Sequence, residues 1–60
     1  MKIKFAKEYQ ASSVLFRIGD VLDDINNNCH LEILNERYIL LILNGLRYDI
    51  PRQYINFVKY

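Results

Sequence analysis

Polar and hydrophobic residues alternate along several short stretches of the chain. At its start, Lys2 and Lys4 alternate with Ile3 and Phe5. A period of two residues is typical of a β-strand with one face buried and the other in water. By the same criterion, extended segments are predicted at 15–18, 21–25, 30–33, 46–50 and 55–58. The pattern therefore predicts a small all-β protein.

A few turn-forming residues separate these segments. Asn44-Gly45 lies directly between two hydrophobic runs, and such a pair predicts a tight hairpin because a type I′ turn needs positive φ at both central positions. Pro51 has no backbone donor, so the strand before it is expected to end there. One short helical turn is then expected at Arg52–Tyr54. Further loops or turns are expected at 9–13, 19–20, 26–28 and 35–36.

Residues 21–34 allow a second interpretation. Their apolar positions are also compatible with one face of a helix, but three consecutive asparagines, Asn26–Asn28, lie inside it. Short amide side chains compete with the backbone for hydrogen bonds, which disfavours a helix interior. Strand and helix both stay open for this segment, and small all-β is the predicted fold class.

The composition is that of an ordinary globular protein. Of 60 residues, 52% are hydrophobic and 25% are charged, and eight Lys and Arg against seven Asp and Glu give a net charge of +1. We expect one domain over residues 1–60. A single cysteine excludes an internal disulfide and a multi-cysteine zinc site. The polar beginning and the lack of any apolar stretch near about 18 residues predict no membrane segment and a cytoplasmic location.

Three segments, in order, resemble the Src-homology 3 (SH3) family. Phe5–Tyr9 resembles the ALYDY motif in its last two residues, Leu15–Leu22 resembles the strand and diverging turn L-x-F-x-x-G-D-x-L, and Tyr48–Ile55 resembles G-Y-I-P-x-N-Y-V. The resemblance spans nearly the whole chain. It implies a small SH3-like barrel of about five or six antiparallel strands, with a short 3-10 turn before the last strand. Residues 26–37 exceed the family's usual connection, which implies an insertion or an added strand.

The resemblance also implies a ligand groove. This chain retains Tyr9, Pro51 and Tyr54 at groove positions, and Asp49 stands where the family has an aromatic residue. It has no tryptophan, Lys7 replaces the first tyrosine of ALYDY, and the loop after Tyr9 lacks acidic residues. Polyproline ligands stack on a row of aromatic ridges, so these departures support the fold more than they support binding of proline-rich peptides. This residual groove of Tyr9, Asp49, Pro51 and Tyr54 is the first candidate protein-binding site.

A second candidate site lies in the uninterrupted apolar segment 38–43. As a strand, the segment has Tyr38, Leu40 and Ile42 on one face and Ile39, Leu41 and Leu43 on the other. A strand in a small barrel has one face toward water. Either residues 26–34 cover the second face, or another chain does. Ile39, Leu41 and Leu43 are the candidate residues for binding a partner protein or a second copy.

Catalytic and metal chemistry find little support in the residue inventory. Cys29 and His30 are neighbours, so on an extended strand they point to opposite faces and cannot act as nucleophile and base. We interpret the pair as a loop cysteine beside an exposed histidine. The acidic residues Asp20, Asp23 and Asp24 are too few for a calcium loop, and one cysteine with one histidine is too few for zinc. We therefore expect no catalytic residue, no metal site and no cofactor.

The leading functional hypothesis is a non-enzymatic protein–protein interaction module. Its brevity is typical of a standalone accessory or inhibitor protein, such as those that phages or mobile elements carry. One alternative is a self-associating structural subunit. Another is a small β-barrel that binds nucleic acid, with tyrosines or Phe57 as stacking platforms. Its cations would be Lys2, Lys4, Lys7, Arg17, Arg37, Arg47, Arg52 and Lys59.

Overall fold

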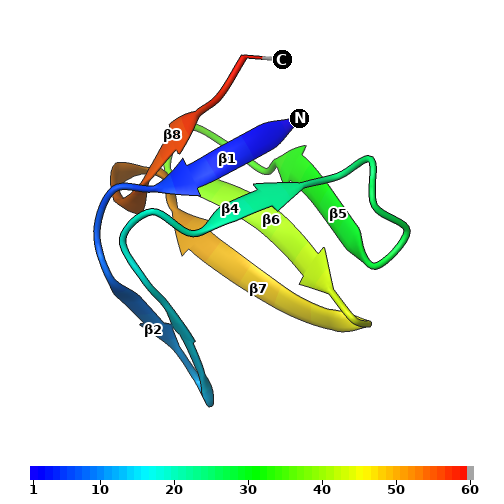
Figure 1. The fold of residues 1–60 in the computed structure, drawn as a ribbon, viewed down its shortest axis with the longest axis horizontal. Coiled ribbons are helices and arrows are strands. Elements are labelled where there is room, and N and C mark those ends of the chain that lie inside the picture. The colour runs from blue at the N-terminus through cyan, green and yellow to red at the C-terminus, as the bar shows by residue number, and fades with distance from the viewer. Residues whose placement is uncertain (60) are drawn as a thin grey trace.

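Residues 1–59, which the computed structural model describes, form eight short β-strands and one turn of 3-10 helix (Figure 1). In chain order these are β1 (Lys2–Phe5), β2 (Tyr9–Ala11), β3 (Val14–Phe16), β4 (Val21–Asp23), β5 (Cys29–Ile33), β6 (Tyr38–Leu43), β7 (Leu46–Pro51), η1 (Arg52–Tyr54) and β8 (Ile55–Phe57). The predicted all-β class is confirmed. The helix considered for residues 21–34 is not formed, because β4, a loop and β5 occupy that segment. Among the described residues, no helix has the length and apolarity needed to cross a membrane.

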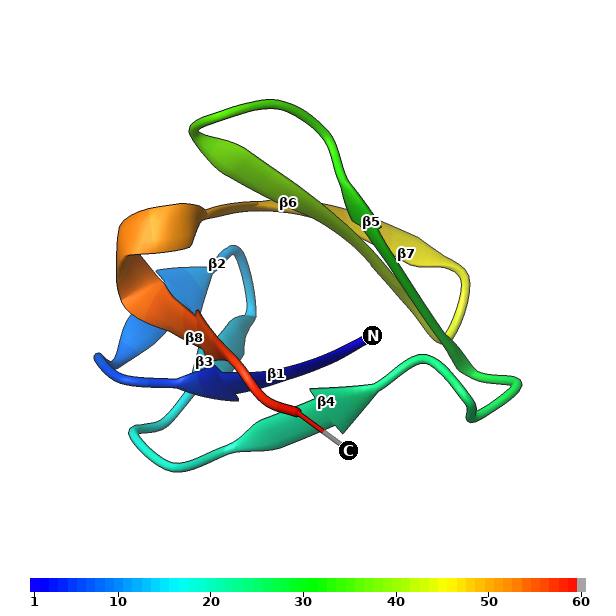
Figure 2. The ribbon, with the colours of Figure 1, turned by 90° about the horizontal axis from the view of Figure 1, so that it is seen from above.

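The strands form three antiparallel sheets. β1 lies between β4 and β8, β6 lies between β5 and β7, and β2 pairs with β3 alone. Figure 2 shows the two three-stranded sheets facing each other, with the β2–β3 hairpin to one side of the space between them. No ladder connects the three sheets within residues 1–59, so strand pairing does not close the expected barrel.

The core lies between the two three-stranded sheets and the hairpin. Phe5 and Phe16 stack in its centre, with ring centroids 4.7 Å apart, and Tyr48 meets the Phe16 ring edge-on at 5.9 Å. Each fully buried large side chain stabilises the fold by about 1.5–3 kcal/mol. The buried core residues are Ile3, Phe5, Phe16, Cys29, Leu31, Ile39, Leu41, Ile50 and Ile55.

The two strongest turn predictions are confirmed. Asn44 and Gly45 join β6 to β7 with φ angles of 51° and 81°, the left-handed conformation that a type I′ turn requires. Pro51 is the last residue of β7, and η1 follows it at once. The hairpin turn fixes the register of β6 against β7, with Leu43 opposite Leu46 and Leu41 opposite Tyr48.

The prediction of a loop at residues 9–13 is wrong for Tyr9–Ala11, which form β2. Gln10 connects this hairpin through its side-chain amide, which donates to the carbonyls of Ser12 at 2.7 Å and Val14 at 3.2 Å. Ser12 takes a positive φ of 55° at the tip. Sequence alternation alone did not reveal this pairing, because three residues are too few to show a period.

Two other predicted strands are shorter than expected, and in each an aspartate terminates the extended run. β3 ends before Arg17, whose N–H donates to Asp20 Oδ2 at 2.8 Å. β4 ends at Asp23, whose Oδ1 accepts the N–H of Ile25 at 3.1 Å. Such local side-chain acceptors favour turns over strand ladders.

Candidate protein-binding surface

Two tyrosines from distant parts of the sequence meet at the surface. The rings of Tyr9, at the start of β2, and Tyr54, at the end of η1, have centroids 4.8 Å apart and are tilted by 50°. Backbone bonds hold the two segments together, because the Tyr54 carbonyl accepts the N–H of Ala6 at 2.9 Å and that of Lys7 at 3.4 Å. Both rings remain half-exposed. The Lys7 ammonium lies 5.8 Å from the Tyr54 ring centroid.

Pro51 and Tyr38 extend this region on the other side of η1. They are direct partners in the β6–β7 register, and the Arg52 N–H donates to the Arg37 carbonyl at 2.8 Å. This contact holds the turn before β6 against η1. Between them is a depression of ≈ 370 Å³ lined by Glu36, Arg37, Tyr38, Pro51, Arg52 and Gln53.

Tyr38 is the surface residue that the sequence analysis did not select. It is 39% exposed and opens β6 directly opposite Pro51. The available signal was an aromatic side chain at the head of the most apolar strand. The sequence did not show which face of the strand is exposed, because residues on both faces are apolar.

Asp49 lies on the outward side of β7, and its Oδ1 accepts the Arg47 Nε–H at 3.0 Å. Next to it, the β2–β3 hairpin and β7 enclose a second depression of ≈ 380 Å³, which Tyr9 and Asp49 both line. Tyr9 also contacts Tyr54, and Pro51 caps the turn that ends in Tyr54. The structure therefore brings Tyr9 close to Tyr54 and to Asp49, whereas Pro51 lines the first depression with Tyr38.

The other candidate set lies in the core instead. Ile39 and Leu41 are 0% exposed, and Leu43 packs against them from the end of β6. Ile39 and Leu41 therefore cannot contact a partner without unfolding, whereas Leu43 is only partly buried. The opposite face of the strand points outward, and on it Leu40 is 9% exposed.

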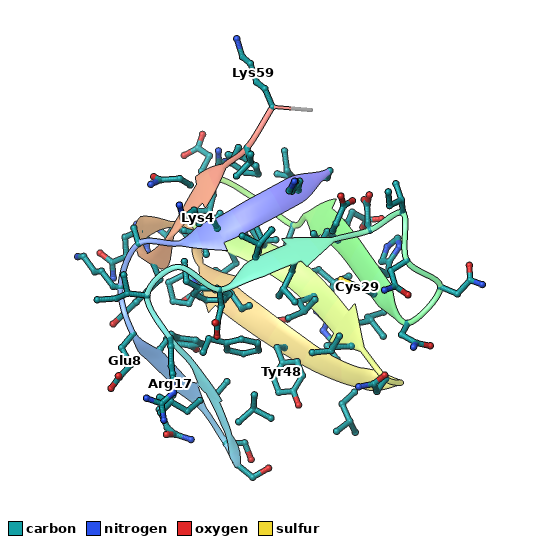
Figure 3. The ribbon with its side chains drawn as sticks, in the orientation of Figure 1. Lys4, Glu8, Arg17, Cys29, Tyr48 and Lys59 are labelled. Atoms are coloured by element: carbon teal, nitrogen blue, oxygen red, sulfur yellow. The ribbon has the colours of Figure 1, made fainter. Side chains whose placement is uncertain are left out.

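Cys29 belongs to the core and to a strand, which corrects the interpretation as a loop cysteine. It opens β5 with its side chain directed inward and is 8% exposed (Figure 3). Burial raises the pKa of its thiol, and the carboxylates of Asp24 and Asp23 raise it further. His30 is on the outward face, with Nε2 3.6 Å from Glu32 Oε1. The two side chains therefore lie on opposite faces of β5, as expected.

The acidic residues near β4 have separate roles in the fold. Asp20 and Asp23 accept backbone N–H groups in turns, and Asp24 Oδ1 is 2.7 Å from the α-amino group of Met1. Within residues 1–59, no three His, Cys, Asp or Glu side chains gather closely enough to hold a metal ion.

The cations of the described chain do not form one basic face. Lys4 lies on the outward face of β1, Arg17 follows β3, and Lys59 lies beyond β8, and Figure 3 shows these three pointing in different directions. Arg47 lies on the other three-stranded sheet and is paired with Asp49.

Comparisons of the chain with protein-family models, with curated proteins and with solved structures found no match.

Proposed function

We propose that this chain is a non-enzymatic interaction module with an SH3-like topology that binds an extended segment of another protein. The binding site is the surface formed by Tyr9, Tyr38, Pro51 and Tyr54, hereafter the tyrosine surface. Asp49 lies at its border, in the depression that Tyr9 also lines.

The order of the strands supports the topology. β1 is flanked by β4 and β8, a three-stranded meander follows the hairpin, and a 3-10 turn separates β7 from the final strand. The sequence resemblance implies the strand that ends at Pro51, the 3-10 turn that carries Tyr54 and the last strand. The added segment at 26–37 contains β5, the edge strand of the meander.

The observation that carries the proposal is the fixed contact between the half-exposed rings of Tyr9 and Tyr54. Two rings with centroids 4.8 Å apart form an apolar platform. The backbone hydrogen bonds from Ala6 and Lys7 hold this platform before any ligand arrives. Binding to rigid aromatic side chains loses little conformational entropy, and aromatic ridges of this kind accept extended, proline-rich segments.

Tyr38 supplies the aromatic side chain that this surface otherwise lacks. Its position beside Pro51 gives the surface two apolar sites, one at Tyr9 and Tyr54 and one at Tyr38 and Pro51. An extended peptide presents alternate side chains at regular intervals, so it can engage both sites while its backbone passes over η1.

A peptide selection tests this proposal. Random peptides displayed in a library are selected on the immobilised domain, and the enriched peptide is then titrated against variants. We expect enriched sequences to contain proline and apolar residues. Tyr54→Ala should raise the dissociation constant of the peptide by about tenfold or more, because an aromatic contact at the centre of the interface is lost.

Phe57→Ala is the matched control, because Phe57 is a 45% exposed aromatic residue on β8 outside the tyrosine surface. It should leave the affinity unchanged. Circular dichroism establishes that both variants are folded. Equal effects of Tyr54→Ala and Phe57→Ala, or no enrichment of any peptide, would contradict the proposal.

A further inference from the structure

On the outward face of the β5–β6–β7 sheet, two parallel rows of side chains lie beside the pair Tyr38–Pro51. The register places His30 and Arg47 on either side of Ile42, and it places Glu32 and Asp49 on either side of Leu40. Directly opposed residues in antiparallel strands project to the same side of a sheet. Each row therefore has a hydrophobic centre and two polar ends.

The two rows have opposite electrostatic character. His30 and Arg47 present N–H donors. Glu32 and Asp49 present carboxylates. The rows are two residues apart along each strand, or about 7 Å. The pairs His30–Glu32 at 3.6 Å and Arg47–Asp49 at 3.0 Å bridge the rows within one molecule.

The polar ends are open to solvent. The side chains of His30, Glu32, Arg47 and Asp49 are 56%, 59%, 60% and 46% exposed. Nothing within residues 1–59 covers this face as the opposite sheet covers the inward one. Leu40 and Ile42 lie between the charged side chains as a narrow apolar strip.

This arrangement is complementary to itself. A two-fold axis that crosses the three strands midway between the rows brings a second copy face to face with the first. The donor row of each copy then lies on the carboxylate row of the other, and the two apolar strips meet in the centre. Two-fold interfaces use the same patch on both subunits, so self-complementary charge is what they require.

We propose that the outward face of β5–β6–β7 is a dimer interface that binds a second copy of this chain. Each copy contributes Leu40 and Ile42 to the centre, and His30 and Arg47 pair with Glu32 and Asp49 of the other copy. The interface adjoins the tyrosine surface, because Tyr38 and Pro51 form the next cross-strand pair on the same outward face, and it does not include Tyr9 or Tyr54.

The dimer is weak and depends on salt. The sheet has three strands of five or six residues, and its face is small beside the roughly 800 Å² that each partner buries in a standard interface. Leu40 is only 9% exposed in the single chain, so dimer formation buries little additional apolar area. Exposed charges supply the specificity, and added salt screens them.

Sedimentation equilibrium at low ionic strength, over a series of protein concentrations, tests the proposal. The apparent mass of the unmodified chain should rise from 7.2 kDa toward twice that value. Arg47→Glu makes the donor row acidic and should raise the dimer dissociation constant by about tenfold or more. The double variant Glu32→Lys with Asp49→Lys makes both rows basic and should do the same.

The decisive experiment mixes the Arg47→Glu variant with the double variant Glu32→Lys, Asp49→Lys. Neither should dimerise alone, but their faces carry opposite charge, so an equimolar mixture should regain the mass of a dimer. Failure of the mixture to associate would overturn the proposal. An unmodified chain that remains a monomer at every concentration, or charge variants that dimerise as well as the unmodified chain, would also overturn it.

Tyr54→Ala serves as the control that separates the two surfaces. It should leave the dimer dissociation constant unchanged even if it abolishes peptide binding. In NMR spectra of the unmodified chain, dilution should shift the amide signals of β5, β6 and β7 and leave those around Tyr9 and Tyr54 unchanged. Shifts confined to the tyrosine surface would assign self-association to that surface and contradict the proposed interface.

Discussion

Both faces of β6 are apolar, yet they are buried by different means. On the inward face, Ile39 and Leu41 are 0% exposed because the facing sheet and the hairpin pack against them. On the outward face, Leu40 is 9% exposed, and its neighbours across the sheet are the charged residues Glu32 and Asp49. A hydrophobic run therefore does not identify the core side of a strand. The identity of the cross-strand neighbours distinguishes the two faces.

Among the variants considered, Leu41→Ala on the inward face of β6 should lower the free energy of unfolding most. The substitution opens a cavity in the core and should lower the free energy of unfolding by about 2–5 kcal/mol. A domain of this length has a total stability of only about 3–9 kcal/mol, so the variant should be largely unfolded at moderate temperature. Urea denaturation followed by circular dichroism measures the difference.

Leu40→Ala is the matched variant on the outward face of the same strand. Its cross-strand neighbours Glu32 and Asp49 are exposed, so water can reach the space that the substitution leaves, and the expected loss is about 1 kcal/mol. Equal losses of unfolding free energy in the Leu40→Ala and Leu41→Ala variants would contradict this contrast. They would mean that the outward face is as well packed as the core.

The two faces of β5 should show a similar but smaller contrast. Cys29→Ser keeps the size of the side chain but puts a hydroxyl in the core, which should cost about 1–3 kcal/mol because the hydroxyl loses its water partners. His30→Ser, one residue later on the exposed face, should change stability by about 0.5 kcal/mol or less. Thermal unfolding of both variants tests the contrast. A larger loss at His30 than at Cys29 would contradict it.

The turn between β6 and β7 determines which residues of β6 face inward. Gly45→Ala should cost about 1 kcal/mol, because Gly45 has a φ of 81° that other residues adopt only with strain. No atom lies within 4 Å of the position that the added methyl group would take, so the cost is conformational. Asn44→Gly keeps the turn geometry and should be close to neutral. The denaturant midpoints of the two variants measure the two losses of stability. A larger loss for Asn44→Gly than for Gly45→Ala would contradict the prediction.

The parts of the fold that follow local rules could be predicted from the sequence. Asn44-Gly45 and Pro51 dictate backbone conformation by their own covalent structure, and the alternation at Lys2–Phe5 follows the pleat of a strand. β2 could not be predicted in this way, because three residues are too few to show a period, and its turn has an added contact between the Gln10 side chain and the carbonyls of Ser12 and Val14. That contact exists only once the turn has formed.

The candidate site was only partly predictable for a related reason. Tyr9, Pro51 and Tyr54 carried a recognisable pattern, and the structure brings Tyr9 and Tyr54 together. Tyr38 was missed, and the set Ile39, Leu41 and Leu43 was selected instead, because 39–43 has no polar residue that would identify the outward face of β6. That face is identified only by the pairing of Leu40 with Glu32 and Asp49, which joins residues far apart in the chain.

The smallest expected effect concerns the charged pair on the outward face. Arg47 and Asp49 are 60% and 46% exposed and meet at 3.0 Å, and an exposed pair of this kind contributes about 0.2–1 kcal/mol. A double-mutant cycle of Arg47→Ala and Asp49→Ala, measured at high dilution where the single chain prevails, should give a coupling energy in that range. A coupling above about 2 kcal/mol would mean that the charges of the outward face support the monomer as strongly as the core does. The charged rows would then belong to the stability of one chain, and their complementarity to a second copy would lose its significance.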